Sequence, residues 1–166
     1  MANIYLLRHG KIAGNAALYG HTDVDVLAGT NEKIVKQFLQ ENIPVDRIFS
    51  SPLKRCSSLS SAINEKMSCE LTYLSGLKEM NFGQYDGIAF DDLYQNQQIW
   101  GQLERFWQNP VQHSLPEAEL LTGFSYRVLQ AWRDVIDKIQ QESSAKNILV
   151  VCHGGVIRMI LAQVLN

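Results

Sequence analysis

Two short apolar segments near opposite ends of the chain each run into a His-Gly pair, and this arrangement constrains the fold most. Ile4–Leu7 lead directly into Arg8-His9-Gly10, and Ile148–Cys152 lead directly into His153-Gly154-Gly155. Continuous apolar runs of this length are typical of buried strands in a parallel sheet. Ligands of open α/β sheets bind at the carboxyl ends of the strands. Neighbouring strands would therefore bring His9 and His153 into one pocket.

The segment that follows the first of these strands alternates predicted helices and strands. We expect a helix from about Glu32 to Glu41, a strand at Arg47–Ser50, a helix capped by Ser51 with Pro52 at its first position, and a strand at Glu70–Leu74. Strands and helices that alternate at this spacing form parallel, right-handed βαβ units. The pattern predicts an α/β protein with a parallel sheet.

Regular periodicity is lost between about residues 77 and 116. Phe82–Gly87 is rich in turn residues, Asp91 or Asp92 is expected to cap a short helix, and an aromatic cluster follows at Trp100, Phe106 and Trp107. We interpret residues 80–116 as a lid-like insertion within a single domain, 1–166, over the carboxyl edge of the sheet. The alternative is that these aromatic side chains only bury a small core of the insertion itself.

Two more helices and two loops complete the predicted organisation. A long helix is expected from about Thr122 to Gln141, a surface turn at Ser143–Lys146, and a final helix that starts at Gly155. The loop Lys11–Asn31 is long for a compact domain, and such loops are usually functional.

Net charge, cysteine content and hydropathy argue against nucleic-acid binding, secretion and membrane insertion. The formal net charge of −2 argues against a broad nucleic-acid-binding surface. Cys56, Cys69 and Cys152 lie in apolar segments without metal-site spacing, and we interpret them as reduced core residues of an intracellular protein. The sequence shows neither a signal peptide nor an apolar run near the ~20 residues that span a bilayer. A cytoplasmic location without a membrane partner is expected.

Three motifs together resemble one enzyme family. Arg8-His9-Gly10, the Ser50-Ser51-Pro52-Leu53-Lys54-Arg55 segment and His153-Gly154-Gly155 resemble the histidine phosphatase (phosphoglycerate mutase-like) superfamily. The resemblance implies a three-layer α/β/α fold, with a mostly parallel sheet and helices on both faces. It also implies a small-molecule phosphomonoester as substrate, a phosphohistidine intermediate, and neither a metal nor a cofactor.

Phosphoryl transfer through histidine needs a nucleophile and a cationic cradle. A neutral imidazole is a competent nucleophile near pH 7, and arginine stabilises the phosphoryl oxygens through its planar fork. His9 and His153 are both possible nucleophiles from the residues alone. Arg8 lies directly beside His9, which favours His9 as the nucleophile. Arg8 and Arg55 are the candidate phosphate-binding cations, and the resemblance assigns His153 to the phosphate pocket.

Glu79 is the candidate general acid. The segment Leu77–Gly83 resembles the family's Leu-x-Glu-x-x-x-Gly, in which the glutamate protonates the leaving oxygen. A carboxylic acid at neutral pH needs a raised pKa, which a site flanked by Met80 and Phe82 could provide. The alternative is an exposed charge in a turn.

Five further residues are assigned to the pocket. Asn15 occupies a family position from which its amide could bind phosphate, and Gly154 lets a backbone N–H approach an anion. Gly20 and His21 are placed on the substrate side. Glu119 lies in Pro116-Glu117-Ala118-Glu119, a weakened form of the family's Pro-x-Gly-Glu, and is assigned to the substrate side with a role in orienting the nucleophile.

Several positions depart from the family pattern. Ile12 replaces the usual threonine, Ala118 replaces a glycine, and the chain stops one helix after His153, where relatives continue. Ile12 and this stop favour one alternative function, a non-catalytic phosphate-binding regulatory module. The sequence does not determine the oligomeric state.

The expected activity is that of a metal-independent phosphomonoesterase. Within the superfamily, the pattern around Phe82-Gly83, Trp107, Glu119 and Arg127-Val128 resembles α-ribazole-5′-phosphate phosphatases of cobalamin nucleotide-loop assembly. A broad-specificity sugar-phosphate or nucleotide phosphatase is the enzymatic alternative. Competing substrates are distinguished by a panel of phosphomonoesters.

Overall fold

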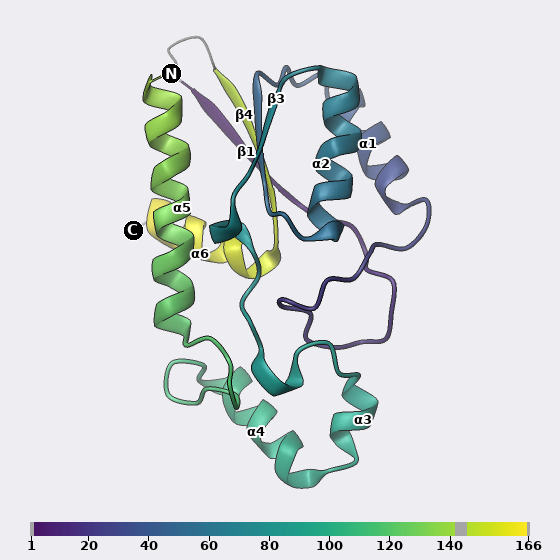
Figure 1. Ribbon diagram of the computed structural model, residues 1–166, viewed down its shortest axis with the longest axis vertical. Helices are drawn as coiled ribbons and strands as arrows, with labels where there is room; N and C mark the ends of the chain where they lie inside the picture. The colour runs from purple at the N-terminus through teal and green to yellow at the C-terminus, as the bar shows by residue number, and fades with distance from the viewer. Residues whose placement is uncertain (1, 142–145, 166) are drawn as a thin grey trace.

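A four-stranded sheet in the order β1-β4-β2-β3 organises the molecule (Figure 1). The computed structural model describes residues 2–141 and 146–165. The strands are β1 (Asn3–Arg8), β2 (Arg47–Ser50), β3 (Glu70–Tyr73) and β4 (Asn147–Cys152), and each pairs in parallel with its neighbours. Because Arg8 pairs in register with Cys152, the two strands deliver His9 and His153 side by side.

Helices cover both faces of the sheet (Figure 1). The helices α1 (Thr30–Gln40) and α2 (Lys54–Met67) pack on one face, and α5 (Leu121–Gln141) and α6 (Gly154–Leu165) pack on the other. Alternate residues of β4 enter the two cores: Ile148 and Val150 face α5 and α6, whereas Leu149 and Val151 face α1 and α2. Burial on both sides explains the continuous apolar run in this strand. The expected three-layer α/β/α fold is confirmed.

Most predicted elements are present, with shifted ends. The strand β2 has the expected bounds, β3 is one residue shorter, and α1 begins at Thr30 instead of Glu32. The helices α5 and α6 each begin one residue earlier than expected. The predicted turn at Ser143–Lys146 lies outside the described residues, apart from Lys146.

Two predicted helix caps are wrong. The helix α2 starts at Lys54, and its cap position is Leu53, without a side-chain hydrogen bond. Ser51 lies before this cap, and its Oγ accepts from the Leu53 N–H at 3.4 Å and lies 2.8 Å from His153 Nε2. The short helix α3 (Phe90–Tyr94) starts after Ala89, so Asp91 and Asp92 lie in its first turn and not at its cap.

The segment between β3 and α5 lies beyond the carboxyl ends of the strands (Figure 1). It contains the 3-10 turns η1 (Ser75–Leu77) and η2 (Gly83–Tyr85), the helix α3, and a helix that the sequence did not reveal, α4 (Gln97–Gln108). Asn96 caps α4, since its side-chain oxygen accepts hydrogen bonds from the N–H groups of Gln98 (3.0 Å) and Ile99 (3.2 Å).

The aromatic side chains of this segment pack largely against one another. Trp100 makes edge-to-face contacts with Phe90 at 6.3 Å, with Tyr94 at 5.0 Å and with Trp107 at 5.5 Å between ring centroids. Tyr94 and Trp107 stay exposed, whereas Phe90 and Trp100 pack against the main core, so both interpretations of the insertion stay predictions. Phe106, by contrast, packs edge-to-face on Phe82 at 6.1 Å, next to the polar residues described below.

Two of the three cysteines belong to the core. Cys56 and Cys152 are buried, Cys69 is partly buried, and all three are unpaired. Burial raises the pKa of Cys152 to about 12, so this side chain is a thiol. Among the described residues, no helix combines the length and apolar character that crossing a membrane requires.

Candidate active site

His9 follows β1 and is held in one tautomer. Its backbone N–H donates to the Cys152 carbonyl at 3.3 Å, and its Nδ1 lies 2.8 Å from the carbonyl oxygen of Gly10. A carbonyl oxygen only accepts, so Nδ1 carries the proton and Nε2 presents a lone pair. Burial lowers the pKa of His9 to about 4, and the nearby charges of Arg55 and Arg8 contribute to this shift. The imidazole is therefore neutral and nucleophilic at pH 7.

His153 is completely buried beside it. The two ring centroids are 5.2 Å apart in an edge-to-face arrangement. Arg55 Nε donates to His153 Nδ1 at 3.2 Å, and Nε2 then donates to Ser51 Oγ at 2.8 Å. Burial, followed by the charge of Arg55, lowers the pKa of His153 to about 2. The strand register thus brings together the two imidazoles that the sequence places at opposite ends of the chain.

Arg55 is 1% exposed and connects His153 to the loop after β1. Besides its bond to His153, its guanidinium donates to the carbonyl oxygens of Thr22 (3.0 Å), Tyr19 (3.0 Å) and Gly20 (2.6 Å). Burial lowers the pKa of this group from an ordinary value far above 7, so its cation persists next to both imidazoles. Direct contact between Arg55 and a phosphate stays a prediction.

Asp86 holds the same loop from the opposite side. Its carboxylate accepts hydrogen bonds from the backbone N–H groups of Gly20 (3.1 Å), His21 (2.8 Å), Thr22 (2.9 Å) and Phe82 (3.0 Å). Burial raises the pKa of Asp86, but these hydrogen bonds outweigh it and hold the pKa below its usual value. Gly20 fits here because a Cβ at this position would lie 2.0 Å from the Met80 carbonyl. Sequence analysis did not identify Asp86.

Glu79 and Arg8 converge on the first turn of α6. Glu79 Oε2 accepts from the N–H of Gly155 at 3.0 Å, and Oε1 accepts from the N–H of Met80 at 3.1 Å. A Cβ on Gly155 would lie 2.2 Å from Glu79 Oε1, and a Cβ on Gly154 would lie 3.3 Å from Arg8 Cζ. The two glycines therefore admit a carboxylate and a guanidinium to the helix N-terminus. The group that accepts from the Gly155 N–H in this structure is Glu79.

Glu119 pairs with Arg127, and its assignments to the substrate side and to orienting the nucleophile stay predictions. Glu119 forms a bidentate pair with Arg127, with Oε1 at 2.9 Å from Nε and Oε2 at 2.7 Å from Nη2. Oε2 also accepts from the N–H of Asn81 at 3.3 Å. Burial raises the pKa of Glu119, but the bond to Arg127 outweighs it and lowers the pKa overall. These bonds direct the carboxylate to the segment that carries Glu79 and not to His9.

Asn15 and His21 are exposed on the loop after β1. The carbonyl oxygen of Asn15 accepts from the Tyr19 hydroxyl at 3.0 Å. Burial, followed by the charges of Arg127 and Lys78, lowers the pKa of His21. A phosphate contact for Asn15 and a substrate contact for His21 stay predictions.

A pocket of about 370 Å³ opens beside Glu79 and Gly155. Its walls come from the insertion, from α5 and from α6, and most of its lining side chains are apolar. Four of them are aromatic: Phe82, Phe106, Trp107 and Phe124. The candidate general acid therefore faces a space suited to an apolar leaving group.

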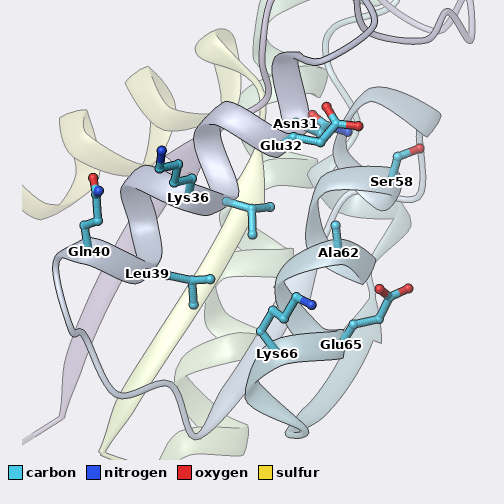
Figure 2. Close-up of a pocket in the computed structure, with 10 residues that line it drawn as sticks. Asn31, Glu32, Lys36, Leu39, Gln40, Ser58, Ala62, Glu65 and Lys66 are labelled. Carbon is cyan, nitrogen blue, oxygen red and sulfur yellow. The ribbon is translucent and has the colours of Figure 1, made fainter.

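A larger hollow, of about 750 Å³, lies between α1 and α2 (Figure 2). Figure 2 shows the charged side chains Glu32, Lys36, Glu65 and Lys66 at this groove, together with Leu39 and Ala62. None of the candidate site residues lines it. Of these two hollows, the candidate site residue Glu79 lines only the smaller one.

The motifs, the fold and the paired histidines define a phosphoryl-transfer enzyme, and comparison with known proteins agrees. Residues 4–166 match the family model described as histidine phosphatase superfamily (branch 1), and the chain belongs to this superfamily. It is a phosphatase of a family that comprises phosphatases and mutases.

Two curated relatives illustrate the range of names in the family. A candidate phosphoserine phosphatase of Hydrogenobacter thermophilus is 30% identical over 97% of this chain and 77% of its own length. The adenosylcobalamin/alpha-ribazole phosphatase of Salmonella typhimurium is 27% identical over 98% of this chain and 79% of its own length. The structure of Bacillus stearothermophilus YhfR superposes with a TM-score of 0.83 at 21% identity, covering 96% of this chain and 78% of that one. This last likeness supports the fold.

Proposed function

We propose that the protein is a metal-independent phosphomonoesterase that forms a phosphohistidine on His9. The observation that carries the proposal is the state of His9: Nδ1 is bonded to the Gly10 carbonyl, Nε2 is free to attack, and the pKa of about 4 keeps the ring neutral. Arg55 and Arg8 supply positive charge near the His9 ring, which contributes to its lowered pKa. Charge of this sign stabilises the oxygens of a transferring phosphoryl group.

The proposed reaction has two steps. His9 Nε2 attacks phosphorus while the bond from phosphorus to the ester oxygen breaks, and the proton of Glu79 passes to the departing alcohol. Water then attacks the phosphohistidine, Glu79 takes up a proton from that water, and inorganic phosphate leaves with His9 restored. Glu79 thus acts as the general acid in the first step and as the general base in the second, while His9 is the nucleophile and then the leaving group.

We propose α-ribazole-5′-phosphate as the substrate. Its leaving group carries an aromatic benzimidazole base, which suits a pocket lined by Phe82, Phe106, Trp107 and Phe124. The name of the Salmonella relative supports the same choice. A sugar phosphate or phosphoserine would need more polar partners than this lining provides, which makes the broad-specificity alternative less suited to the pocket.

A panel of phosphomonoesters, assayed in excess EDTA, tests the proposal. We expect kcat/KM for α-ribazole-5′-phosphate to exceed the values for glucose 6-phosphate, AMP and phosphoserine by at least tenfold. Similar values across the panel would indicate the broad-specificity alternative. Phosphate binding without turnover would indicate the non-catalytic module, and activity that depends on added Mg²⁺ or Zn²⁺ would contradict the metal-independent mechanism.

Rapid quench during turnover tests the intermediate. We expect acid-labile, base-stable phosphate on His9, and we expect His9→Ala to abolish both the label and turnover. His153→Ala should slow formation of a label that still maps to residue 9. A label on His153, or one that persists in His9→Ala, would reverse the two roles.

A further inference from the structure

The segment that carries Glu79 lies outside helices and strands. Residues 78–82 connect η1 to η2 without regular backbone pairing. Backbone carbonyls in such a segment need other partners when they are shielded from water. A general acid must also be held within a fraction of an ångström of its productive position. Some other part of the molecule must therefore fix this segment.

Arg127 of α5 supplies those partners. Its Nη1 donates to the carbonyl oxygens of Gly76 at 2.9 Å and Lys78 at 3.0 Å, and its Nη2 donates to the carbonyl oxygen of Glu79 at 3.3 Å. One guanidinium thus binds the backbone before Glu79 and the backbone of Glu79 itself. Its planar fork of N–H groups allows one side chain to reach all three oxygens.

Glu119 orients Arg127 and extends the same attachment past Glu79. Its carboxylate receives Arg127 Nε and Nη2, and it accepts from the N–H of Asn81 at 3.3 Å. The backbone N–H of Glu119 in turn donates to the Asn81 carbonyl at 3.0 Å. The two side chains are only 25% and 19% exposed, so solvent screens this pair less than it screens a surface pair. Hydrogen bonds from Arg127 and Glu119 therefore hold the backbone both before and after Glu79.

We propose that Arg127, oriented by Glu119, is the positioning residue of the general acid; this inference rests on the proposed function. Arg127 binds the backbone of Glu79 and leaves the carboxylate to the Gly155 N–H, at 3.0 Å. Arg127 is absent from the lining of the pocket beside Glu79. Its loss should therefore impair proton donation to the leaving oxygen more than substrate binding or attack by His9.

The dependence on the leaving group distinguishes this role from a purely structural one. Benzyl phosphate and 4-nitrophenyl phosphate are similar in size, but only the benzyl alcohol oxygen needs a proton in order to leave. General acid catalysis contributes about a hundredfold or more. We expect Arg127→Gln to lower kcat/KM for benzyl phosphate by about ten- to a hundredfold, and for 4-nitrophenyl phosphate by at most a few-fold.

Two further variants define the requirement. Arg127→Lys keeps the charge but cannot reach the three carbonyls and two carboxylate oxygens with one ammonium group, so we expect little rescue. Glu119→Gln should show the same selective loss for benzyl phosphate in a milder form. Arg133→Gln is the matched control, because Arg133 is an exposed arginine of the same helix, and we expect wild-type values for both substrates.

The comparison uses kcat/KM, which reports steps up to phosphorylation of His9, together with the melting temperature of each variant. A loss at least tenfold greater for benzyl phosphate than for 4-nitrophenyl phosphate supports the inference. Equal losses for both substrates, or no loss, would overturn it while leaving the proposed function intact. If Arg127→Gln does not fold, Glu119→Gln decides by the same criterion. A wild-type protein that hydrolyses neither ester would overturn the proposed function and this inference together.

Discussion

At the scale of single residues, the two glycines at the start of α6 show how the site tolerates close approach of charged groups. Gly154 and Gly155 resemble glycines that expose a helix N-terminus to phosphate, but their side-chain positions are occupied by Arg8 and Glu79. At the helix N-terminus the Gly155 N–H donates to Glu79 Oε2 at 3.0 Å and so fixes the position of this side chain. Glycine at 155 is thus a requirement of the candidate general acid.

Gly155→Ala tests this requirement. The added methyl group would lie 2.2 Å from Glu79 Oε1, so the carboxylate must move away from its N–H partner. We expect kcat/KM for benzyl phosphate to fall by tenfold or more in this variant. The loss would occur even though alanine is ordinarily preferred to glycine within a helix by about 1 kcal/mol.

Gly101→Ala in α4 is the control for Gly155→Ala. A Cβ at Gly101 meets only the end of the Arg105 side chain, at 3.6 Å, which is an ordinary contact. We expect unchanged activity and a small gain in the free energy of unfolding, measured by urea titration. Full activity in Gly155→Ala would show that the position of Glu79 does not depend on this glycine.

At the scale of elements, the loop after β1 depends on two side chains that bind it from different elements. Arg55 of α2 binds the carbonyl groups of residues 19, 20 and 22, and Asp86, directly after η2, binds the N–H groups of residues 20, 21 and 22. A loop without regular structure is thereby ordered through its backbone. Because Arg55 binds both this loop and His153, the order of the loop and the position of the Arg55 side chain depend on each other.

Removal of the Asp86 carboxylate should therefore release the loop. In Asp86→Ala we expect faster hydrogen exchange at the amides of Gly20, His21 and Thr22, and a fall in the free energy of unfolding of about 1–3 kcal/mol, because a partly buried network loses its charged acceptor. Turnover should fall as well, since Arg55 loses the carbonyls that hold it. Asp91→Ala, at an exposed position in the first turn of α3, is the control. Unchanged exchange at the three amides would contradict this account of the loop.

The elements that the sequence predicted are those with a local signal. The apolar runs of β1 and β4 revealed the sheet and, through it, the pairing of His9 with His153. The helix α4 also has such a signal, because Ile99, Leu103 and Phe106 recur at helical spacing, but we interpreted its aromatic residues as a cluster and did not predict the helix. The Ser51 cap was wrong because the helix begins later, at Lys54; the Ser51 hydroxyl instead joins the Leu53 N–H to His153, a tertiary contact that local preference does not reveal.

At the scale of the whole molecule, the contacts that order the site join residues far apart in the sequence. Asp86 binds an N–H group 66 residues away, and Arg127 binds a carbonyl 48 residues away. No sequence motif shows which backbone group either residue binds. A single sequence therefore predicts the reacting residues better than the residues that hold them in place. The candidate nucleophile and general acid were identified from motifs. Arg127 was noted only as part of a family-like pattern, and its contacts, like those of Asp86, emerged from the fold.

The two buried imidazoles should also make global stability depend on pH. The pKa of His9 is lowered to about 4 and that of His153 to about 2, whereas both lie near 6.5 in the unfolded chain. Below pH 6.5 the unfolded chain therefore binds protons that the folded protein does not. The contribution of these two neutral imidazoles to the free energy of unfolding is fully present above this pH. As the pH falls below 6.5, each imidazole lowers the free energy of unfolding by about 1.4 kcal/mol per pH unit.

Urea unfolding at pH 7, 6 and 5 measures this dependence. His153→Gln should be less stable than the wild type at pH 7, because a packed and hydrogen-bonded ring is lost, but its stability should fall less steeply toward pH 5. His113→Gln is the control: His113 is exposed, so its surroundings change little on unfolding, and we expect the wild-type slope. Equal slopes in the wild type and in His153→Gln would show that the buried imidazole of His153 takes up its proton in the folded protein, and would contradict its assignment as a neutral ring at the site.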